Sequence, residues 1–450
     1  MHENRRYVKL ILATALTAAA GLLPSIARAE VVAATNGPAV LANAGGTPTV
    51  AYLDARGLVV TTRAAGGWQP SRVTLPVPAS ESVVVSAAVG RDGRPAVLVQ
   101  DPVRQALVVA WRRPARWLVL RVAQAARGST LGVGGLALAR TGTPLVAYAV
   151  RRPTAKTYLR LVRIDAKGRA RTTQITKLGF PDSALPPSAT PHVTRRGVVR
   201  VVEAYTSALI DWFPDKRTWT GQYLFASLLG SPIGPVFALP GPTTAVVAWT
   251  QDYPSLGETH VFVQQGPPTG EAADLLPHAR VVALTLAGGV PEVAANDWIA
   301  SDDAETYAPL IAAAGTAPVE LDGYIDGYAA VGATRQLLLT TDQGLEWFSA
   351  PRPGIHVSLS VDGAGRAAGR VDGAAGGTIS IYRDSPGTPR ELVATAAIGS
   401  DGSFAVQVPP VSTFYRAVYR DPTTGIPYAA LLRSPAGAAG DGANVLRRAE

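Results

Sequence analysis

The sequence contains no cysteine. This absence excludes disulfide bonds, cysteine-ligated zinc, iron–sulfur clusters and a thiol nucleophile, and it removes the lipid-attachment cysteine of a classical bacterial lipoprotein. Helical periodicity is nearly absent, and beyond residue 29 no apolar run is long enough to span a bilayer. Hydrophobic residues are abundant, at 47% of 450, together with 45 Gly and 36 Pro. Such a chain can bury a core and needs many turns, and its length allows one large all-β domain with a smaller one.

Residues 1–29 have the three parts of a secretory signal peptide. A positive start and the apolar residues 10–23 are followed by Ala27-Arg28-Ala29, a small-residue cleavage site before Glu30. The alternative is a membrane anchor, but an anchor needs about 20 apolar residues and this run is shorter. The sequence therefore predicts Sec-type export to a secreted or cell-envelope location, with no transmembrane segment after cleavage.

A segment of the form Gly-x-Pro followed by a short apolar strand recurs along the chain. Strong copies lie at 46–52, 93–99 and 142–148, in steps of 47 and 49 residues, and weaker copies begin at Pro242 and Gly289. Four short strands and their turns fill about 40–50 residues, the size of one propeller blade. One blade cannot bury both of its faces alone, so the repeat predicts blades that stack around a ring.

A tryptophan that follows a Thr-Thr pair by six residues is a second marker. It occurs at Trp68 and Trp347, which are 279 residues or six steps of 46.5 apart, and Trp117 and Trp219 fall at similar phases. Residues 30–352 are therefore predicted to form a β-propeller of about seven four-stranded blades, with six or eight left open and an open sandwich as the alternative. The strands expected in the first blade are 38–43, 47–54, 58–63 and 68–74.

Residues 340–347 read Thr-Thr-Asp-Gln-Gly-Leu-Glu-Trp. This pattern resembles the Asp box of sialidase-like propellers, and residues 61–68 are a decayed copy with Arg63 in the Asp position. The resemblance implies a turn between the third and fourth strands of a blade, whose structural residues are Thr340, Asp342, Gly344 and Trp347. Asp and Thr would bond the turn backbone, Gly would accept positive φ, and Trp would pack between blades. In that family the box is structural, so it implies a fold and no activity.

After residue 352 the pattern changes to seven short strands separated by turn signals such as Asp372-Gly373. This spacing is typical of a β-sandwich of about 80 residues. Residues 377–383, 401–404 and 413–418 resemble the Ig-like modules of bacterial secreted proteins. The resemblance implies that residues 353–436 form an Ig-like β-sandwich that serves as a spacer or an adhesive unit, while residues 437–450 are expected to be a disordered tail. The expected strands are 356–361, 367–371, 378–383, 392–397, 404–408, 414–419 and 428–432.

Charge is unevenly placed along the predicted propeller. From Arg104 to Arg200 there are 19 basic and two acidic residues, whereas residues 201–350 contain four basic and 17 acidic ones. Because consecutive blades are neighbours, one flank should be basic and the opposite flank acidic, although strand alternation points adjacent residues to opposite faces. Basic residues beside aromatic ones suit polyanions, and the alternative is a solvated rim without a ligand. The candidate polyanion surface consists of Arg112, Arg113, Arg116, Arg160 and Arg163.

No catalytic residue, metal or cofactor is predicted. The resemblance to sialidases would imply an arginine cluster, a Tyr–Glu pair, an acid Asp and an early Arg-Ile-Pro motif, and that motif is missing. Neither H-E-x-x-H, G-x-S-x-G nor a phosphate-binding glycine motif is present. An acidic loop matches no EF-hand spacing and is interpreted as solvated. Its members are Asp297, Asp302, Asp303 and Glu305, and the isolated histidines are His192, His260, His278 and His356.

The sequence therefore predicts an exported, non-catalytic binding or scaffold protein that recognises glycans or anionic polymers, without nucleic acid as a partner. The alternative is a sialidase-like, glycan-active hydrolase. The lining of the central channel distinguishes the two hypotheses. Paired carboxylates with an arginine cluster would favour the hydrolase, whereas a lining of Ala, Val and Gly would favour binding.

Overall fold

The computed structural model describes residues 29–34, 38–154, 156–179, 187–205, 207–227, 230–241, 245–266, 272–301, 304–351, 354–374, 376–384, 390–410 and 414–432. These residues form antiparallel β-strands and one 3-10 turn, η1 (Ala79–Glu81), so the all-β prediction is confirmed. Among them, no helix has the length and apolar character needed to cross a membrane. The predicted disordered tail and all but the last residue of the predicted signal peptide lie outside the described residues.

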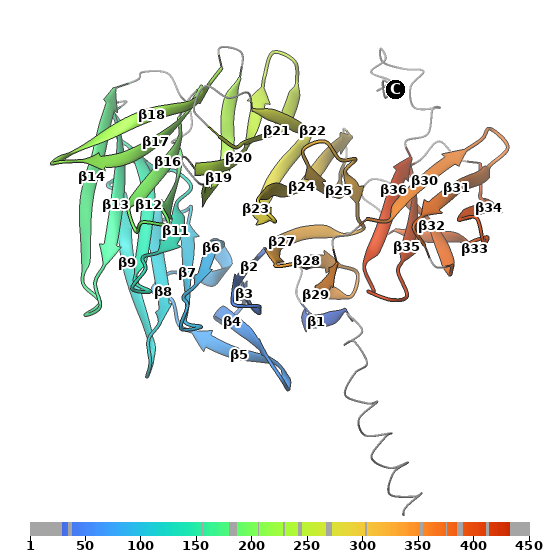
Figure 1. Cartoon of the computed structure of the whole chain (residues 1–450), viewed down its shortest axis with the longest axis horizontal. Coiled ribbons are helices and arrows are strands. Elements are labelled where there is room, and N and C mark those ends of the chain that lie inside the picture. The colour runs from blue at the N-terminus through green and yellow to red at the C-terminus, as the bar shows by residue number, and fades with distance from the viewer. Residues whose placement is uncertain are drawn as a thin grey trace, which may run out of the picture.

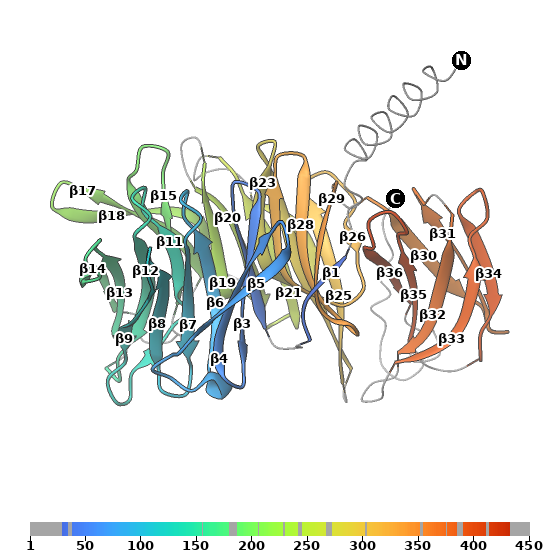
Figure 2. The same cartoon turned by 90° about the horizontal axis from the view of Figure 1, so that it is seen from below.

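Seven sheets are formed by the described residues between 30 and 351 (Figures 1 and 2). The first sheet comprises β2 (Ala39–Ala44), β3 (Thr47–Asp54), β4 (Gly57–Ala64) and β5 (Gly67–Val73), and the second comprises β6 (Val83–Val89), β7 (Pro95–Asp101), β8 (Ala106–Arg112) and β9 (Trp117–Gln124). The third comprises β10 (Thr130–Leu131), β11 (Gly135–Leu138), β12 (Pro144–Arg151), β13 (Lys156–Ile164) and β14 (Ala170–Gly179), and the fourth comprises β15 (Ser188–Val193), β16 (Val199–Tyr205), β17 (Ala208–Asp215) and β18 (Thr218–Ala226). The fifth comprises β19 (Ser231–Pro240), β20 (Ala245–Tyr253), β21 (Glu258–Gln264) and β22 (Ala273–Pro277), and the sixth comprises β23 (Ala279–Ala287), β24 (Val290–Ser301), β25 (Ala304–Ala313) and β26 (Val319–Glu320). The seventh comprises β27 (Tyr324–Val331), β28 (Thr334–Thr341), β29 (Gly344–Pro351) and the N-terminal strand β1 (Glu30–Ala33).

The inner strands of these sheets surround a common axis. Consecutive sheets touch through β2, β6, β11, β15, β19, β23 and β27, and β27 in turn contacts β2. From its inner strand each sheet runs outward in chain order. The seventh sheet is the exception, because its outermost strand, β1, precedes all the other strands in the sequence. The arrangement is propeller-like, and the alternative of two stacked sheets is wrong.

The hydrophobic core lies between the sheets rather than within one of them. β7 is buried along its whole length. Its residues alternate between two faces, so Leu98 packs toward the third sheet while Val97 and Val99 pack toward the first. The same alternation places an apolar cluster at each of the other sheet pairs, including the seventh and the first. Each fully buried aliphatic side chain contributes about 1.5–3 kcal/mol, and it does so only when the neighbouring sheet is present.

The repeated Gly-x-Pro segment marks the second strand of a sheet. Its three strong copies form β3, β7 and β12, and the weaker copies lead into β20 and β24. The four strands predicted for the first unit are present as β2 to β5. The repeat is therefore a real structural unit.

The tryptophan marker does not keep one structural position. Trp68, Trp117 and Trp219 lie on outermost strands, whereas Trp347 lies on β29, the third strand of its sheet. The separation of 279 residues between Trp68 and Trp347 therefore does not measure a whole number of blades, and the predicted six steps of 46.5 residues are wrong.

Two further sheets follow the ring. Their strands agree with the seven predicted strands to within one residue. The three-stranded sheet contains β30 (His356–Val361), β31 (Arg366–Asp372) and β34 (Ser403–Gln407), and the four-stranded sheet contains β32 (Thr378–Asp384), β33 (Glu391–Ala397), β35 (Phe414–Arg420) and β36 (Pro427–Leu432).

The C-terminal sheets are packed directly against the ring. One continuous apolar cluster includes Ile325 and Phe348 from the ring and Tyr415 and Tyr428 from the C-terminal sheets. At the same boundary the Asp322 N–H donates to the carbonyl of Pro427, at 2.9 Å. The two parts therefore share a core and a polar contact.

Candidate functional site

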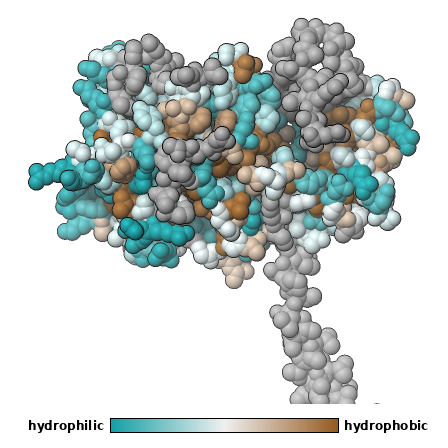
Figure 3. Space-filling model, turned by 45° about the horizontal axis from the view of Figure 1, so that its top comes forward, coloured by the Kyte–Doolittle hydropathy of each residue, from teal (hydrophilic) through white to brown (hydrophobic). Residues whose placement is uncertain are grey.

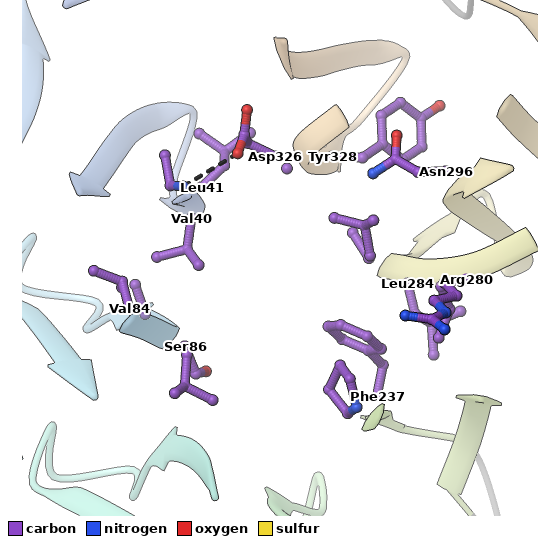
Figure 4. A pocket seen from close by; sticks show the side chains of 18 of the residues that line it. Val40, Leu41, Val84, Ser86, Phe237, Arg280, Leu284, Asn296, Asp326 and Tyr328 are labelled. Carbon is purple, nitrogen blue, oxygen red and sulfur yellow. Dashed lines mark hydrogen bonds between the residues drawn. The ribbon is translucent and has the colours of Figure 1, made fainter. Parts of the chain in front are cut away.

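A cavity of about 600 Å³ lies where the inner strands meet (Figure 4). Its walls come from β2, β6, β19, β23 and β27, and Asn296 on β24 completes them. Most lining side chains are aliphatic or aromatic, as Val40, Val84, Phe237 and Leu284 illustrate. The lining is therefore close to the composition that we expect for a binding channel.

Asp326 is the carboxylate in the wall of this cavity. Its side chain is buried and accepts hydrogen bonds from the Ala39 N–H at 3.1 Å and the Thr340 hydroxyl at 2.7 Å. The first of these bonds, drawn dashed in Figure 4, joins the inner strand of the seventh sheet to that of the first. Burial raises the pKa of Asp326 to about 6, although both hydrogen bonds favour the ionised form. Asp326 thus belongs to the contact that closes the ring.

Gly327 allows β27 to approach β2 closely. A Cβ atom at this position would lie 2.5 Å from the Cβ of Leu41, a distance that side chains do not adopt. The closure between the last and first sheets therefore needs a residue without a side chain here.

Two further polar groups of the wall, the Asn296 amide and the Tyr328 hydroxyl, have hydrogen-bond partners. The Asn296 amide accepts from the Ile325 N–H at 2.9 Å and donates to the Ile325 carbonyl at 3.0 Å. The Tyr328 hydroxyl donates to Glu292 at 2.8 Å, and Arg335 pairs with the same carboxylate at 2.7 Å. Burial, followed by the Glu292 charge, raises the pKa of Tyr328.

The cavity presents only part of the set of groups that the resemblance to sialidases implies. Asp326 and Tyr328 line it, and the Tyr328 hydroxyl donates to Glu292 at 2.8 Å, but no arginine cluster lies among its described lining residues. Of the described residues that line it, Asp326 is the single carboxylate and Arg280 the single cation. A sialidase uses a tyrosine in place of the second facing carboxyl group, so the feature that the lining lacks is the arginine cluster. The mainly apolar lining fits binding, while the Tyr328–Glu292 pair keeps the hydrolase alternative open.

The residues of the predicted Asp box do not occupy the expected turn. Thr341 ends β28 and Gly344 begins β29, and these are the second and third strands of the seventh sheet. The position differs because β1 supplies the fourth strand, so the chain provides only three strands locally. Thr340 does not bond this turn, because its hydroxyl donates to Asp326.

Asp342 does not hold the turn. The Thr341 hydroxyl accepts from the Gln343 N–H at 3.1 Å and donates to Glu346 at 2.7 Å. Asp342 is exposed, and in the part of the chain that the structure describes its carboxylate has no hydrogen-bond partner. Gly344 does have the predicted positive φ, 101°. The hydrogen-bonding role that we assigned to Asp342 is therefore wrong, because the threonine beside it takes that role.

Trp347 packs between sheets, as predicted. The residue is 4% exposed, and its ring meets Trp68 edge-on at 5.8 Å across the boundary of the seventh and first sheets. The Arg63 guanidinium lies 4.8 Å from the Trp347 ring and pairs with Glu30. The intact and decayed copies of the motif thus face each other.

The five arginines of the candidate polyanion surface lie on the second and third sheets but do not share one face. Arg112 lies over Trp117, 5.9 Å from its ring, whereas Arg113 lies over Trp111 and donates to the Ala166 carbonyl of the third sheet at 2.9 Å. Arg160 and Arg163 are an odd number of residues apart on β13, so they point to opposite faces. Arg116 is exposed in the turn before β9.

The fourth sheet contains buried polar groups that were not predicted from the sequence. The Glu203 carboxylate accepts from the Trp212 indole N–H at 2.9 Å, and its second oxygen has no partner. On the same sheet Asp211 lies 2.7 Å from Arg200 and 3.5 Å from His192. A single acid within the apolar strand β16 was the available signal for Glu203.

Asp302 and Asp303 of the predicted acidic loop lie outside the described residues. His260 contacts Asp274 at 2.7 Å and Glu258 at 3.3 Å, so this histidine is not isolated in space. No group of metal-ligating side chains with suitable geometry occurs among the residues that the structure describes.

No family model and no curated protein matches the chain. Weak structural similarity links it to the β-propeller domain of the trilobed protease of Pyrococcus furiosus, with 10% identity, 70% of this chain and 96% of that chain covered, and a TM-score of 0.41. An acylaminoacyl peptidase of Pyrococcus horikoshii has 8% identity, 74% and 58% coverage and a TM-score of 0.41. A Hadza microbial sialidase has 12% identity, 70% and 65% coverage and a TM-score of 0.40. Likeness at this level of identity concerns the fold alone.

Proposed function

We propose that the protein is an exported, non-catalytic binding or scaffold protein of the bacterial cell envelope or medium. The cavity at the centre of the ring carries this proposal. Its walls are mainly aliphatic, and its one carboxylate is engaged in closing the ring. The sialidase-like hydrolase stays the alternative, because Asp326 and the Tyr328–Glu292 pair match part of the group set that the resemblance implies.

In this proposal the seven sheets are the blades of a seven-bladed propeller. The pairing of β1 with β29 then closes the ring by joining the N-terminal strand to the last blade. The two C-terminal sheets would be an Ig-like sandwich that acts as a rigid spacer, and the apolar core that they share with the ring supports this role.

Export is part of the proposal. Cleavage after Ala29 would leave Glu30 as the first residue, and β1 begins at Glu30. The mature protein would therefore retain the whole closing strand, and Glu30 would keep its ion pair with Arg63. Acidic glycans of the cell surface are the ligand class that fits an exported protein with an excess of basic residues between 104 and 200.

Two assays of residues 30–450 test the proposal. Incubation with fluorogenic sialosides should release no fluorophore, while a glycan array should show retention of acidic glycans over neutral ones. Asp326→Asn, which preserves shape, is the control for catalysis. Turnover by the wild type that Asp326→Asn abolishes would overturn the non-catalytic assignment in favour of the hydrolase.

A further inference from the structure

Five cationic side chains line the outer part of the boundary between the second and third sheets. On β13, Lys156 and Arg160 point to the same face as Val162 and Ile164, which pack against the second sheet. Leu159 points to the opposite face of the strand. Lys177 is paired across the sheet with Tyr158 on this face. We call this set the basic seam, and its members are Arg113, Arg152, Lys156, Arg160 and Lys177.

Carboxylates of the described residues do not neutralise the positive charge of the basic seam. None of its five members forms an ion pair with a carboxylate of the described residues. Arg152 and Arg160 lie 4.6 and 6.0 Å from the ring of Tyr158, so they contact an aromatic group instead. The nearby Asp165 is paired with Arg169 at 2.8 Å. The positive potential is therefore available to an anionic partner.

Neutral polar side chains accompany the cations. Thr172 and Gln174 on β14 are exposed and lie opposite Val162 and Arg160, which places them on the same face. Their hydroxyl and amide groups can exchange hydrogen bonds with hydroxyl groups of a ligand. The nine residues of β13 extend over about 26 Å at ~3.3 Å per residue. Hydrophilic residues cover this outer edge of the ring, at the left of Figure 3.

We propose that the basic seam binds a linear polysaccharide whose sugar units carry carboxylate groups. The carboxylates would pair with the guanidinium and ammonium groups, and the sugar hydroxyls would bond Thr172 and Gln174. An extended polymer suits an elongated row of charges better than a compact anion does. This inference rests on the proposed export, since such polymers belong to the cell exterior.

Polygalacturonate is the probe, and binding to mature protein is measured by biolayer interferometry at low salt. The seam variant carries Arg152→Glu, Lys156→Glu and Arg160→Glu. The control variant carries Arg112→Glu, Arg163→Glu and Arg171→Glu, which change the net charge equally but lie outside the basic seam. Arg163 and Arg171 are cross-strand partners on the opposite face of the third sheet. Melting curves confirm that each variant is folded.

The seam variant should bind polygalacturonate about tenfold or more weakly, while the control variant loses less than about threefold. Binding of the wild type should also weaken about tenfold when salt rises to ~0.3 M, where the Debye length falls below ~6 Å. An equal loss in both variants, or no binding of polygalacturonate by the wild type, would overturn the proposal.

A single-stranded oligodeoxythymidylate is the second probe. Seam-dependent binding of this phosphate polymer without binding of polygalacturonate would show that the ligand class is wrong. Sialoside turnover, in contrast, would refute the non-catalytic function and leave the seam result unaffected, so the two failures are distinguishable.

Discussion

Replacing Glu203 with glutamine should remove a pH-dependent loss of stability. The Glu203 side chain is fully buried, and the indole N–H of Trp212 is the donor to one of its oxygens, while the other has no partner. Burial raises the pKa of Glu203 from its ordinary 4.5 to about 7. The folded state therefore binds a proton at this group more tightly than the unfolded state does.

The sign and size of the effect follow from this difference. The stabilisation by the proton is fully present below about pH 4.5 and is lost as the pH rises through about 7. A difference of this size between the folded and unfolded pKa corresponds to about 3 kcal/mol. Glutamine cannot ionise, so the variant avoids this loss, but its buried amide N–H without a partner costs about 1–3 kcal/mol at every pH. The change in unfolding free energy between about pH 4.5 and 8 should thus be about 3 kcal/mol smaller in Glu203→Gln than in the wild type.

Urea unfolding followed by tryptophan fluorescence at about pH 4.5 and 8 measures this difference. Asp342→Asn is the matched control, since it makes the same chemical change at an exposed carboxylate without a partner among the described residues. Burial also raises the pKa of Asp326 to about 6. Its contribution to the pH dependence of the unfolding free energy is the same in all three proteins, so it cancels in the comparison. Parallel pH dependences for the wild type and Glu203→Gln would refute the reasoning, because the carboxylate would then not be the source of the slope.

Trp347→Ala should cost about 3–5 kcal/mol of unfolding free energy, because it leaves a cavity between two sheets, whereas Asp342→Ala should change it by less than about 0.5 kcal/mol. Equal losses in urea unfolding would show that Asp342 holds the turn after all. A chain that starts at Ala34, and therefore lacks β1, should melt at a lower temperature and self-associate, because β29 becomes an exposed edge strand; an unchanged melting temperature and a monomer in light scattering would contradict this. Gly327→Ala should destabilise the ring by about 1–3 kcal/mol through its clash with Leu41, and a calorimetric melting temperature equal to the wild type's would show that β2 and β27 can separate freely.

Local patterns predicted much of the fold. Period-two alternation and Gly or Pro turns are properties of neighbouring residues, which is why the strands of the first unit and of the C-terminal sheets were placed nearly correctly. The Gly-x-Pro repeat found the second strand of five sheets. It missed β16 and β28, because Arg196-Gly197 and Gly332-Ala333 lead into those strands without the proline.

The spacing of the tryptophans did not give the number of blades, and the reason is the topology of the last sheet. The prediction assumed that every sheet takes its four strands from one continuous stretch, but the last sheet completes itself with β1. Pairing between Glu30 and Trp347 joins opposite ends of the ring-forming chain, and no local pattern reports such a contact. The position of the box was misjudged for the same reason, whereas the role of Asp342 was misjudged because Thr341 makes the hydrogen bonds of this turn.

The sequence alone determined the all-β class, the repeat and the excess of basic residues between 104 and 200, since these depend on composition and short-range order. Only the tertiary structure decided which side chains share a site. Ala39 and Asp326 are 287 positions apart, and their hydrogen bond exists because the ring brings the first and last inner strands together. Burial likewise arises only when the sheets stack, and burial is what raises the pKa of Asp326 and Glu203. Chemistry that depends on desolvation and on distant partners cannot be read from neighbours in sequence, because both are created by packing.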